Sequence, residues 1–341
     1  MTIDPPQALL AVRHLSKIFT LSRSTRDFVT AAPQRRLHAL RDVSLEIAPG
    51  EILGIVGESG CGKTTFGRCL AGLERPEAGE LLWHGQPMSH ANNRARRARH
   101  IQMVFQDPYA ALNPRMSLGN MLGEALLVHG IGTSAAERRD RVDALLEMVG
   151  LTPNLKDRLP HAISGGQRQR VCIARALAVE PKLLIADEPV SALDASVQAQ
   201  IINLLEDLRA KLNLALIFIA HDLNVVRHIS DRIAVMYLGE VVETAPTEIL
   251  FARPEHPYTR GLLKAIPQPD PTKRTQVPSI EGEMPDPLNP PTGCALSTRC
   301  PLVLPECGAR HPFLVAGENN HFVRCLNPAA STDFVFTPSS D

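Results

Sequence analysis

The chain has 341 residues and carries 36 Lys and Arg against 36 Asp and Glu, so its formal net charge is zero. That balance argues against a dedicated nucleic-acid binder, which would carry an excess of basic residues. Hydrophobic residues make up 44 % of the sequence, which is enough for a substantial core and excludes disorder over most of its length. We find neither the roughly 20 consecutive apolar residues of a membrane-spanning helix nor the layout of a signal peptide, and we expect a cytosolic protein.

Strand-like and helix-like stretches alternate over the first 240 residues, which predicts an α/β fold. The run DVSLEIA alternates apolar and polar residues, so residues 42–48 are expected to form a strand with one buried face. Short apolar runs predict fully buried strands at residues 51–56, 182–186 and 215–220. Ser134 and Glu137 have the spacing of a capping box, which predicts a helix from there to Gly150. A second amphipathic helix is expected over residues 197–212.

The composition changes near residue 245. Sixteen of the 28 prolines follow position 240. Because proline lacks an amide donor and restricts the residue before it, long helices and strands are not expected there. We therefore predict one domain over residues 1–245 and a loop-rich extension over residues 246–341.

A phosphate-binding loop follows the predicted strand at residues 51–56. Residues 57–64 read GESGCGKT and match G-x-x-x-x-G-K-[ST] without a gap. The glycines let successive amide groups converge on phosphate oxygens, and the following helix directs its positive end at the same anion. We expect Lys63 to contact the β- and γ-phosphates of ATP and the Thr64 hydroxyl to bind Mg²⁺. The predicted ATP-binding residues are Gly57, Glu58, Ser59, Gly60, Cys61, Gly62, Lys63, Thr64 and Thr65. The alternative is a chance glycine-rich turn.

Two adjacent carboxylates, Asp187 and Glu188, follow the apolar run LLIA. In open α/β sheets ligands bind at the carboxyl ends of the strands. We assign Asp187 to Mg²⁺ and Glu188 to the general base that polarises the attacking water. The alternative is an acidic pair at the start of a helix.

From about residue 10 to residue 240 the chain resembles the nucleotide-binding subunits of ATP-binding-cassette transporters. The motifs occur in the family's order: the phosphate loop, VFQDP with Gln106, the signature ISGGQRQR, LLIADEP, SALD ending at Asp194, and IAHDL with His221. The resemblance implies a P-loop ATPase domain with a RecA-like core sheet, an antiparallel β-subdomain and a helical signature subdomain at about residues 107–170.

The resemblance also implies roles for single residues. Gln106 would reach Mg²⁺ and the attacking water, and His221 would hydrogen-bond the γ-phosphate. Phe19 would stack on adenine, although a core phenylalanine at a strand end is the alternative. The signature residues that would close over the ATP of a partner subunit are Ser164, Gly165, Gly166 and Gln167, with Asp194 in the D-loop.

Several strings outside the shared ATPase motifs resemble the ATPase subunits of oligopeptide, dipeptide and nickel importers, most of all the second ATPase of the dipeptide system. They are QDPYAALNPR, HPYTRGLL and PLNPPTGC. The resemblance implies an ATP-hydrolysing motor subunit that powers di- or oligopeptide import, with nickel or glutathione as alternative solutes. The implied partners are a second, non-identical ATPase, two permease subunits and, indirectly, an extracytoplasmic solute-binding protein, with no nucleic acid. Its place would be the cytoplasmic side of the cell membrane, as a peripheral subunit.

Two rival functions are disfavoured relative to a transport motor. A cassette ATPase acting on DNA or ribosomes usually has a coiled-coil insert or two cassettes on one chain, and this chain has neither. A regulatory subunit that binds ATP without turnover is disfavoured by the presence of Glu188 and His221.

Four late cysteines form the last candidate site: Cys294, Cys300, Cys307 and Cys325. Their spacing is compatible with zinc, with an iron–sulfur cluster or with unligated thiols. Related peptide-importer ATPases carry a four-cysteine iron–sulfur site in this region, so the resemblance implies a [4Fe–4S] cluster here. A metal would also supply folding energy to a loop-rich segment. The neighbouring His321 is expected on the surface.

Two further stretches lie outside the motifs. The basic run at residues 94–100 is expected to form a solvated helix face rather than a lipid or nucleic-acid contact. Residues 21–38 form a stretch longer than a simple hairpin needs.

Overall fold

An eight-stranded sheet lies at the centre of the computed structural model, which describes residues 8–21, 34–88, 94–265 and 280–328. In spatial order its strands are β11 (Val315–Ala316), β12 (Phe322–Val323), β10 (Glu240–Pro246), β9 (Arg232–Tyr237), β3 (Ile52–Val56), β8 (Ala215–Ile219), β7 (Leu183–Asp187) and β6 (Ile101–Val104). The five strands from β9 to β6 run parallel, whereas β10, β12 and β11 are antiparallel additions at one edge. The three buried strands expected from the apolar runs are confirmed as β3, β7 and β8.

A second, antiparallel sheet has four strands. Their spatial order is β2 (Arg36–Ile47), β1 (Leu10–Thr20), β4 (Ala78–Trp83) and β5 (Gln86–Pro87). Val43, Leu45 and Ile47 of β2 are buried as the alternating sequence predicts. Most of the long stretch between β1 and β2, residues 22–33, lies outside the described residues.

Both faces of the central sheet are buried, because successive residues of its strands enter two different cores. Ile52 and Val56 belong to the core that includes the helices after β7, whereas Leu53 and Ile55 face the four-stranded sheet and the helix after the phosphate loop. Apolar residues at nearly every strand position are needed for this arrangement, which explains why the sequence of these strands does not alternate.

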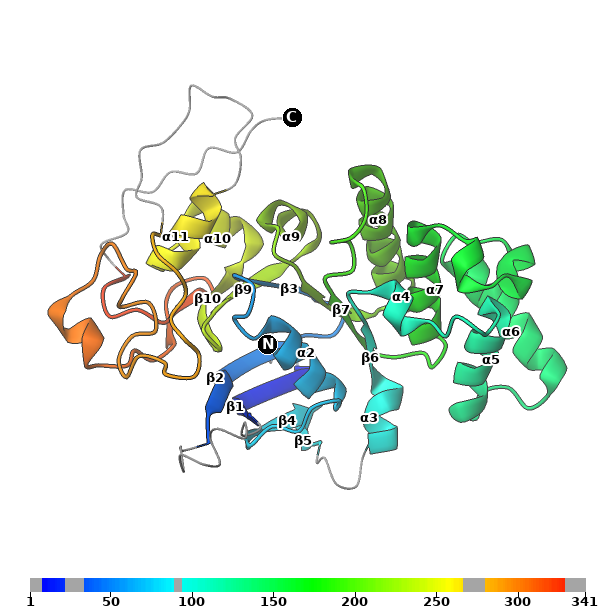
Figure 1. Ribbon diagram of the computed structural model, residues 1–341, viewed down its shortest axis with the longest axis horizontal. Helices are drawn as coiled ribbons and strands as arrows, with labels where there is room; N and C mark the ends of the chain where they lie inside the picture. Colours follow the sequence, from blue (N-terminus) through cyan, green and yellow to red (C-terminus); the bar gives the residue numbers. More distant parts are fainter. Residues whose placement is uncertain (1–7, 22–33, 89–93, 266–279, 329–341) are drawn as a thin grey trace, which may run out of the picture.

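The helices are divided between the same two faces of the central sheet. On one face lie α8 (Ala195–Leu212), α9 (Leu223–Ile229), α10 (Thr247–Ala252) and α11 (Pro257–Lys264). The opposite face carries α2 (Lys63–Ala71), with the four-stranded sheet beyond it and α3 (Arg94–His100) nearby (Figure 1).

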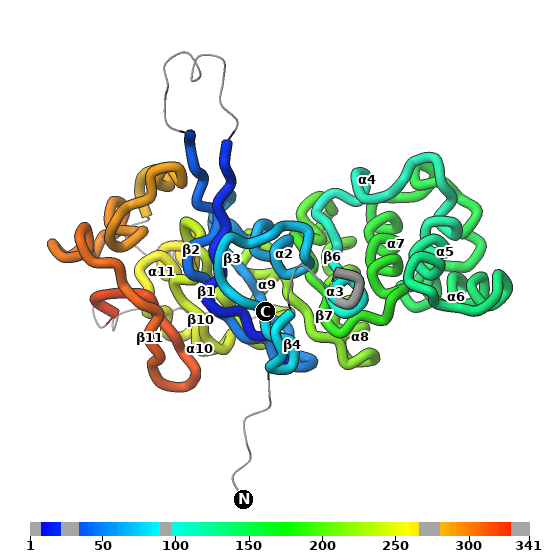
Figure 2. The backbone as a smooth tube through the Cα atoms, turned by 90° about the horizontal axis from the view of Figure 1, so that it is seen from below, coloured from blue at the N-terminus to red at the C-terminus, as the bar shows by residue number. Residues whose placement is uncertain are grey.

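The chain between β6 and β7 forms a helical lobe that projects to one side of the sheets (Figures 1 and 2). Its elements are α4 (Pro108–Ala111), α5 (Leu118–Val128), α6 (Ala135–Met148), the 3₁₀ turns η1 (Pro153–Asp157) and η2 (Pro160–Ala162), and α7 (Gly165–Leu177). Ser134 caps α6 by accepting a hydrogen bond from the Glu137 amide, as its spacing predicts. The predicted α/β architecture of core sheet, antiparallel sheet and helical part is confirmed.

The extension lies on the opposite side of the molecule from the helical lobe (Figure 2). Within residues 280–328 the regular elements are the 3₁₀ turn η4 (Pro305–Gly308), β11 and β12, in agreement with the proline content. Pairing of β12 with β10 nevertheless joins the extension to the central sheet. His321 also connects the extension to the central sheet. This residue, expected on the surface, is 3 % exposed, and its Nε2 lies 2.7 Å from Oε1 of Glu243.

The interpretation of the basic run as a solvated helix face is wrong for Arg97, which is 2 % exposed. Its guanidinium donates to the carbonyl oxygens of Leu70, at 2.7 Å, and Cys69 in the last turn of α2. A cation is favourable at a helix C-terminus, where the last carbonyl groups lack partners within the helix. Arg97 therefore joins α3 to α2.

Candidate functional site

The predicted ATPase residues follow four neighbouring parallel strands. The sheet order β3, β8, β7, β6 brings the loops after these strands to one edge. They carry, in that order, the phosphate loop, His221, the pair Asp187 and Glu188, and Gln106. Because the carboxyl ends of parallel strands meet at the same sheet edge, residues more than 100 positions apart come together there.

The phosphate loop turns between β3 and α2. Gly62, at the N-terminus of α2, has φ +105° and offers no side-chain cap, so the first amide groups of the helix are left to an external acceptor. A Cβ at this position would lie 2.4 Å from the Ala39 carbonyl oxygen. Lys63 is 5 % exposed, and its ammonium group donates to the carbonyl oxygens of Gly57, at 2.7 Å, and Glu58, at 3.0 Å.

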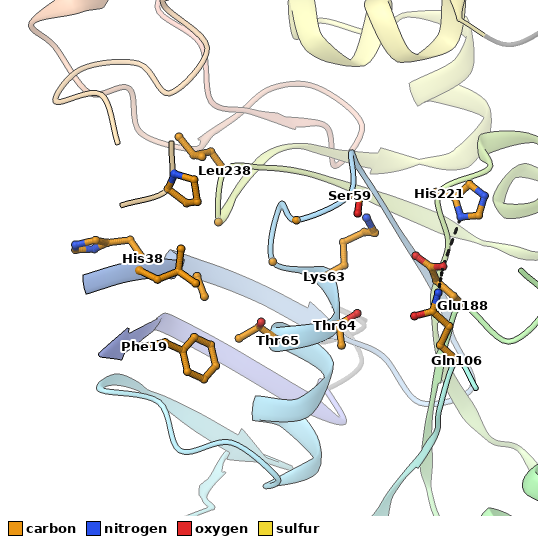
Figure 3. Close-up of a pocket in the computed structure, with 16 residues that line it drawn as sticks. Phe19, His38, Ser59, Lys63, Thr64, Thr65, Gln106, Glu188, His221 and Leu238 are labelled. Carbon is orange, nitrogen blue, oxygen red and sulfur yellow. Dashed lines mark hydrogen bonds and ion pairs between the residues drawn. The ribbon is translucent and has the colours of Figure 1, made fainter. Parts of the chain in front are cut away.

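A cavity of about 450 Å³ opens between the phosphate loop and the antiparallel sheet (Figure 3). Besides loop residues, its wall includes the half-buried Phe19 together with Gln106, Glu188 and His221. Phe19 is thus not a core residue at a strand end. The cavity lies against the uncapped amide groups of α2, an arrangement that suits a ligand with an apolar ring and an anionic tail.

Thr64 and Asp187 meet at the start of α2. The Thr64 hydroxyl donates to Oδ1 of Asp187 at 3.0 Å. Burial raises the pKa of Asp187, while the hydrogen bond from Thr64 lowers it in part. The hydroxyl, this carboxylate and the amide oxygen of Gln106 are all oxygen donors of the kind that Mg²⁺ prefers, so this set of residues fits the ion.

Glu188 is surrounded by the two other predicted catalytic residues. Its Oε2 accepts a hydrogen bond from Nε2 of Gln106 at 2.8 Å and lies 3.6 Å from Nδ1 of His221 (Figure 3). Glu188 has φ +46°, a left-handed conformation that costs free energy in a residue with a side chain. The acidic pair does not start a helix, because α8 begins only at Ala195 and is capped by Asp194.

The signature residues lie elsewhere on the molecule. Ser164 caps α7 in a reciprocal capping box with Gln167. Gly166 lies against α8, where a Cβ would come within 2.5 Å of Val197. Neither Ser164 nor any residue of the helices α4 to α7 lines the cavity. The structure therefore does not bring the signature and the phosphate loop of this chain together.

Sequence reasoning missed several residues that complete the cavity wall: Leu37, His38, Ala39, Leu238, Gly239 and Pro287. The signal available in the sequence was Gly239, because glycine is favoured where the backbone takes a positive φ. It lies in the turn between β9 and β10. In this turn Leu238 and Gly239 have φ values of +46° and +82°. The amide of Gly239 donates to the carbonyl oxygen of Cys61 at 2.9 Å, so this turn is hydrogen-bonded to the phosphate loop.

The expected four-cysteine metal site is wrong. Among the described residues, which include all four cysteines, no group of three or more His, Cys, Asp and Glu side chains is arranged to hold a metal ion. Burial raises the pKa of Cys294 to about 11 and also raises the pKa values of Cys300 and Cys325. The extension is instead joined to the central sheet by the pairing of β12 with β10 and by the buried contact of His321 Nε2 with Glu243 Oε1 at 2.7 Å.

The chain is similar to known proteins along nearly its whole length. The sequence model described as ABC transporter matches residues 40–191, and the one described as oligopeptide/dipeptide transporter, C-terminal region, matches residues 242–307. The oligopeptide transport ATP-binding protein OppF of Escherichia coli is 50 % identical over 86 % of this chain and 89 % of its own length. OppF of Salmonella typhimurium is 47 % identical over 95 % and 97 %.

Solved structures with the same fold include a dimeric post-hydrolysis state of the ATP-binding cassette MJ0796 bound to ADP and Pi. The TM-score is 0.61 at 29 % identity, covering 70 % of this chain and 98 % of that one. The cbiO1 protein from Clostridium perfringens, part of the ABC transporter complex cbiONQ, gives 0.61 at 30 % identity over 72 % and 91 %. In the part of the chain that the structure describes, no helix has the length and apolar character needed to cross a membrane.

Proposed function

Because the chain belongs to the ATP-binding subunits of ABC transporters, in the branch with the oligopeptide/dipeptide transporter C-terminal region, we propose that it is the ATP-hydrolysing motor of a peptide importer. The observation that carries this proposal is the occurrence, on one chain, of the phosphate loop with Gln106, Glu188 and His221 beside it and of the importer-type C-terminal region.

The chemistry follows from the positions of these side chains. Amide groups at the start of α2 and the Lys63 ammonium would bind the phosphates, and Phe19 would stack on adenine. Mg²⁺, held by Thr64, Asp187 and Gln106, would neutralise charge on the phosphate oxygens.

Proton transfer and alignment fall to the residues around Glu188. Its carboxylate, fixed by Gln106, would accept a proton from the attacking water. His221, whose imidazole lies beside that carboxylate, would donate a hydrogen bond to the γ-phosphate and keep the water in line. Holding these groups in place before ATP arrives reduces the cost of reaching the transition state.

The signature would act on a second subunit. Ser164 and the amides of Gly165 and Gly166 open a thirteen-residue helix remote from the cavity of their own chain. A helix N-terminus of this kind binds phosphate well, and the related cassette MJ0796 is a dimer with ADP and Pi. We infer that the signature of this chain, with Asp194 in the adjoining D-loop, covers ATP bound to a second, non-identical ATPase subunit.

The remaining assignments concern assembly. We propose a nucleotide-binding domain over residues 1–245, with its helical subdomain at about 107–170, and an importer-specific extension over 246–341. As an ABC importer subunit the chain works with transmembrane permeases; two such subunits, supplied with solute by an extracytoplasmic binding protein, would hold it at the cytoplasmic face of the membrane.

The test is peptide uptake by cells that lack this chain. Re-expressed wild-type protein should restore uptake of labelled oligopeptides, and the Lys63→Met variant, present at equal level, should not. As a matched control, Lys211→Met changes an exposed lysine on α8 and should restore uptake fully. Uptake that is unaffected by loss of the chain would contradict the proposal. Recovery of the tagged protein with ribosomes or DNA instead of permeases would also contradict it.

A further inference from the structure

The extension is hydrogen-bonded to the phosphate loop at Glu58. Arg299 of the extension donates through both terminal nitrogens to the Glu58 carboxylate at 3.0 to 3.2 Å, across 241 residues of sequence. The Arg299 side chain is 8 % exposed and that of Glu58 31 %. A two-pronged contact of this kind fixes direction as well as distance, because the guanidinium is planar and its donors are rigid.

A second contact holds the backbone of the same residue. The Tyr258 hydroxyl, on α11, accepts a hydrogen bond from the Glu58 amide at 2.9 Å. Tyr258 is fully buried and its ring lies 4.6 Å from that of Tyr237, whose hydroxyl accepts from Arg299 at 3.3 Å. The two tyrosines and the arginine thus form one packed group behind the loop.

The third polar group of Glu58 faces the catalytic side. Its carbonyl oxygen accepts a hydrogen bond from Nζ of Lys63 at 3.0 Å. The amide, carboxylate and carbonyl of Glu58 are therefore all held, the first two by Tyr258 and Arg299 and the third by Lys63. A displacement of Glu58 would move the contacts of the lysine that is expected to bind the phosphates.

The extension reaches the nucleotide cavity at its other end as well. The carbonyl oxygen of Pro287 accepts from the His38 amide at 3.2 Å, and Pro287 lines the cavity. Met284 lies next to Gly60 of the loop, 3.5 Å from the position a Cβ would occupy there.

We propose that Arg299 and Tyr258 are positioning residues that hold the first turn of the phosphate loop in the shape that binds ATP, so that the extension acts on the nucleotide site of its own chain. This inference rests on the proposed ATPase function. Neither residue belongs to a motif of the ATPase domain, and neither lines the cavity.

The test compares full-length variants in the assembled transporter and as isolated chains. Arg299→Met removes the three hydrogen bonds to Glu58 and the one to Tyr237 with little change in length, and Arg299→Lys keeps the charge without the two-pronged geometry. Glu58→Gln weakens the same contact from the side of the loop. The control is Arg310→Met, because Arg310 is an exposed arginine of the same extension. The measured quantities are the KM and kcat of ATP hydrolysis, the Kd of a fluorescent ATP analogue, and the Tm.

We expect Arg299→Met and Glu58→Gln each to raise the KM and the Kd about tenfold, in keeping with the loss of a hydrogen bond to a charged group. At saturating ATP, kcat should change by less than about threefold, since ATP can still order the loop. Arg299→Lys should recover part of the affinity, and Arg310→Met should behave as wild type. The KM of the double variant should be no higher than that of either single variant, because both substitutions remove the same contact between Arg299 and Glu58.

The inference is overturned if folded Arg299→Met lowers the Tm but leaves the KM within about twofold of wild type, which is the result of a merely structural role. If Arg299→Met does not fold, Glu58→Gln decides, and an unchanged KM in that variant overturns the inference. Failure of the wild-type chain to bind ATP would instead overturn the proposed function, and this inference with it.

Discussion

His256 provides a pH dependence of stability whose size follows from its burial. It caps α11, where its Nδ1 accepts a hydrogen bond from the Tyr258 amide at 3.2 Å, and it is 1 % exposed. Burial lowers its pKa from 6.5 to about 4, although the nearby carboxylates of Glu243 and Glu240 act in the opposite direction. The perturbation that isolates this effect is His256→Asn, because asparagine is also a good N-cap and does not titrate.

The sign follows from proton binding. Between pH 6.5 and pH 4 the unfolded chain binds a proton at His256 and the folded chain does not, so acidification favours unfolding. The loss relative to neutral pH is about 1 kcal/mol at pH 5.5 and between about 2 and 3 kcal/mol at pH 4.5, at about 1.4 kcal/mol per pKa unit.

The assay is urea unfolding of the wild-type chain and His256→Asn at pH 7.5, 5.5 and 4.5. Every other group titrates in both proteins, so the difference between their free energies of unfolding isolates His256. As the pH falls from 7.5 to 5.5 and then to 4.5, the wild type should lose more unfolding free energy than His256→Asn, by the amounts given above. If the two proteins lose stability in parallel over this range, the reasoning about His256 is refuted.

Three further changes have sharp expected outcomes. Gly62→Ala should abolish ATP binding and lower the Tm, because its Cβ would lie 2.4 Å from the carbonyl oxygen of Ala39 at φ +105°; an equilibrium titration with wild-type affinity would contradict this. Arg97→Met should destabilise the fold by about 2 kcal/mol by leaving carbonyl groups at the end of α2 unpaired, whereas the exposed Arg99→Met should leave the unfolding midpoint unchanged. Ser164→Ala should leave ATP binding by the isolated chain intact, since Ser164 does not line the cavity, and lower ATPase turnover in the assembled transporter; full turnover there would argue against a site shared between subunits.

The row of functional residues was predictable because it depends on local signals. A glycine-rich loop after an apolar strand, or an acidic pair after another, places each group at a carboxyl strand end, and the parallel sheet then collects them. The N-cap at Ser134 was likewise readable from spacing alone.

Contacts between distant segments were not predictable in this way. The burial of Arg97 depends on α3 docking against the end of α2, and nothing in a basic run distinguishes that outcome from a solvated face. The hydrogen bonds between Arg299 and Glu58 join residues 241 positions apart, and no periodic pattern in the sequence connects them. The error about Cys294 and the three later cysteines came from carrying over a metal site that the family resemblance implied, with the proline content as support. Proline content indicated a segment unable to order itself, but strand pairing with β10 and buried ion pairs supply the order instead.

The most direct test of the central claim, that ATP hydrolysis at Glu188 powers peptide import, is uptake into liposomes that contain the assembled importer. With ATP present, the wild-type complex should release phosphate and accumulate labelled oligopeptide. The complex with Glu188→Gln should bind ATP with similar affinity and do neither. Peptide accumulation by the Glu188→Gln complex at the wild-type rate would contradict the account.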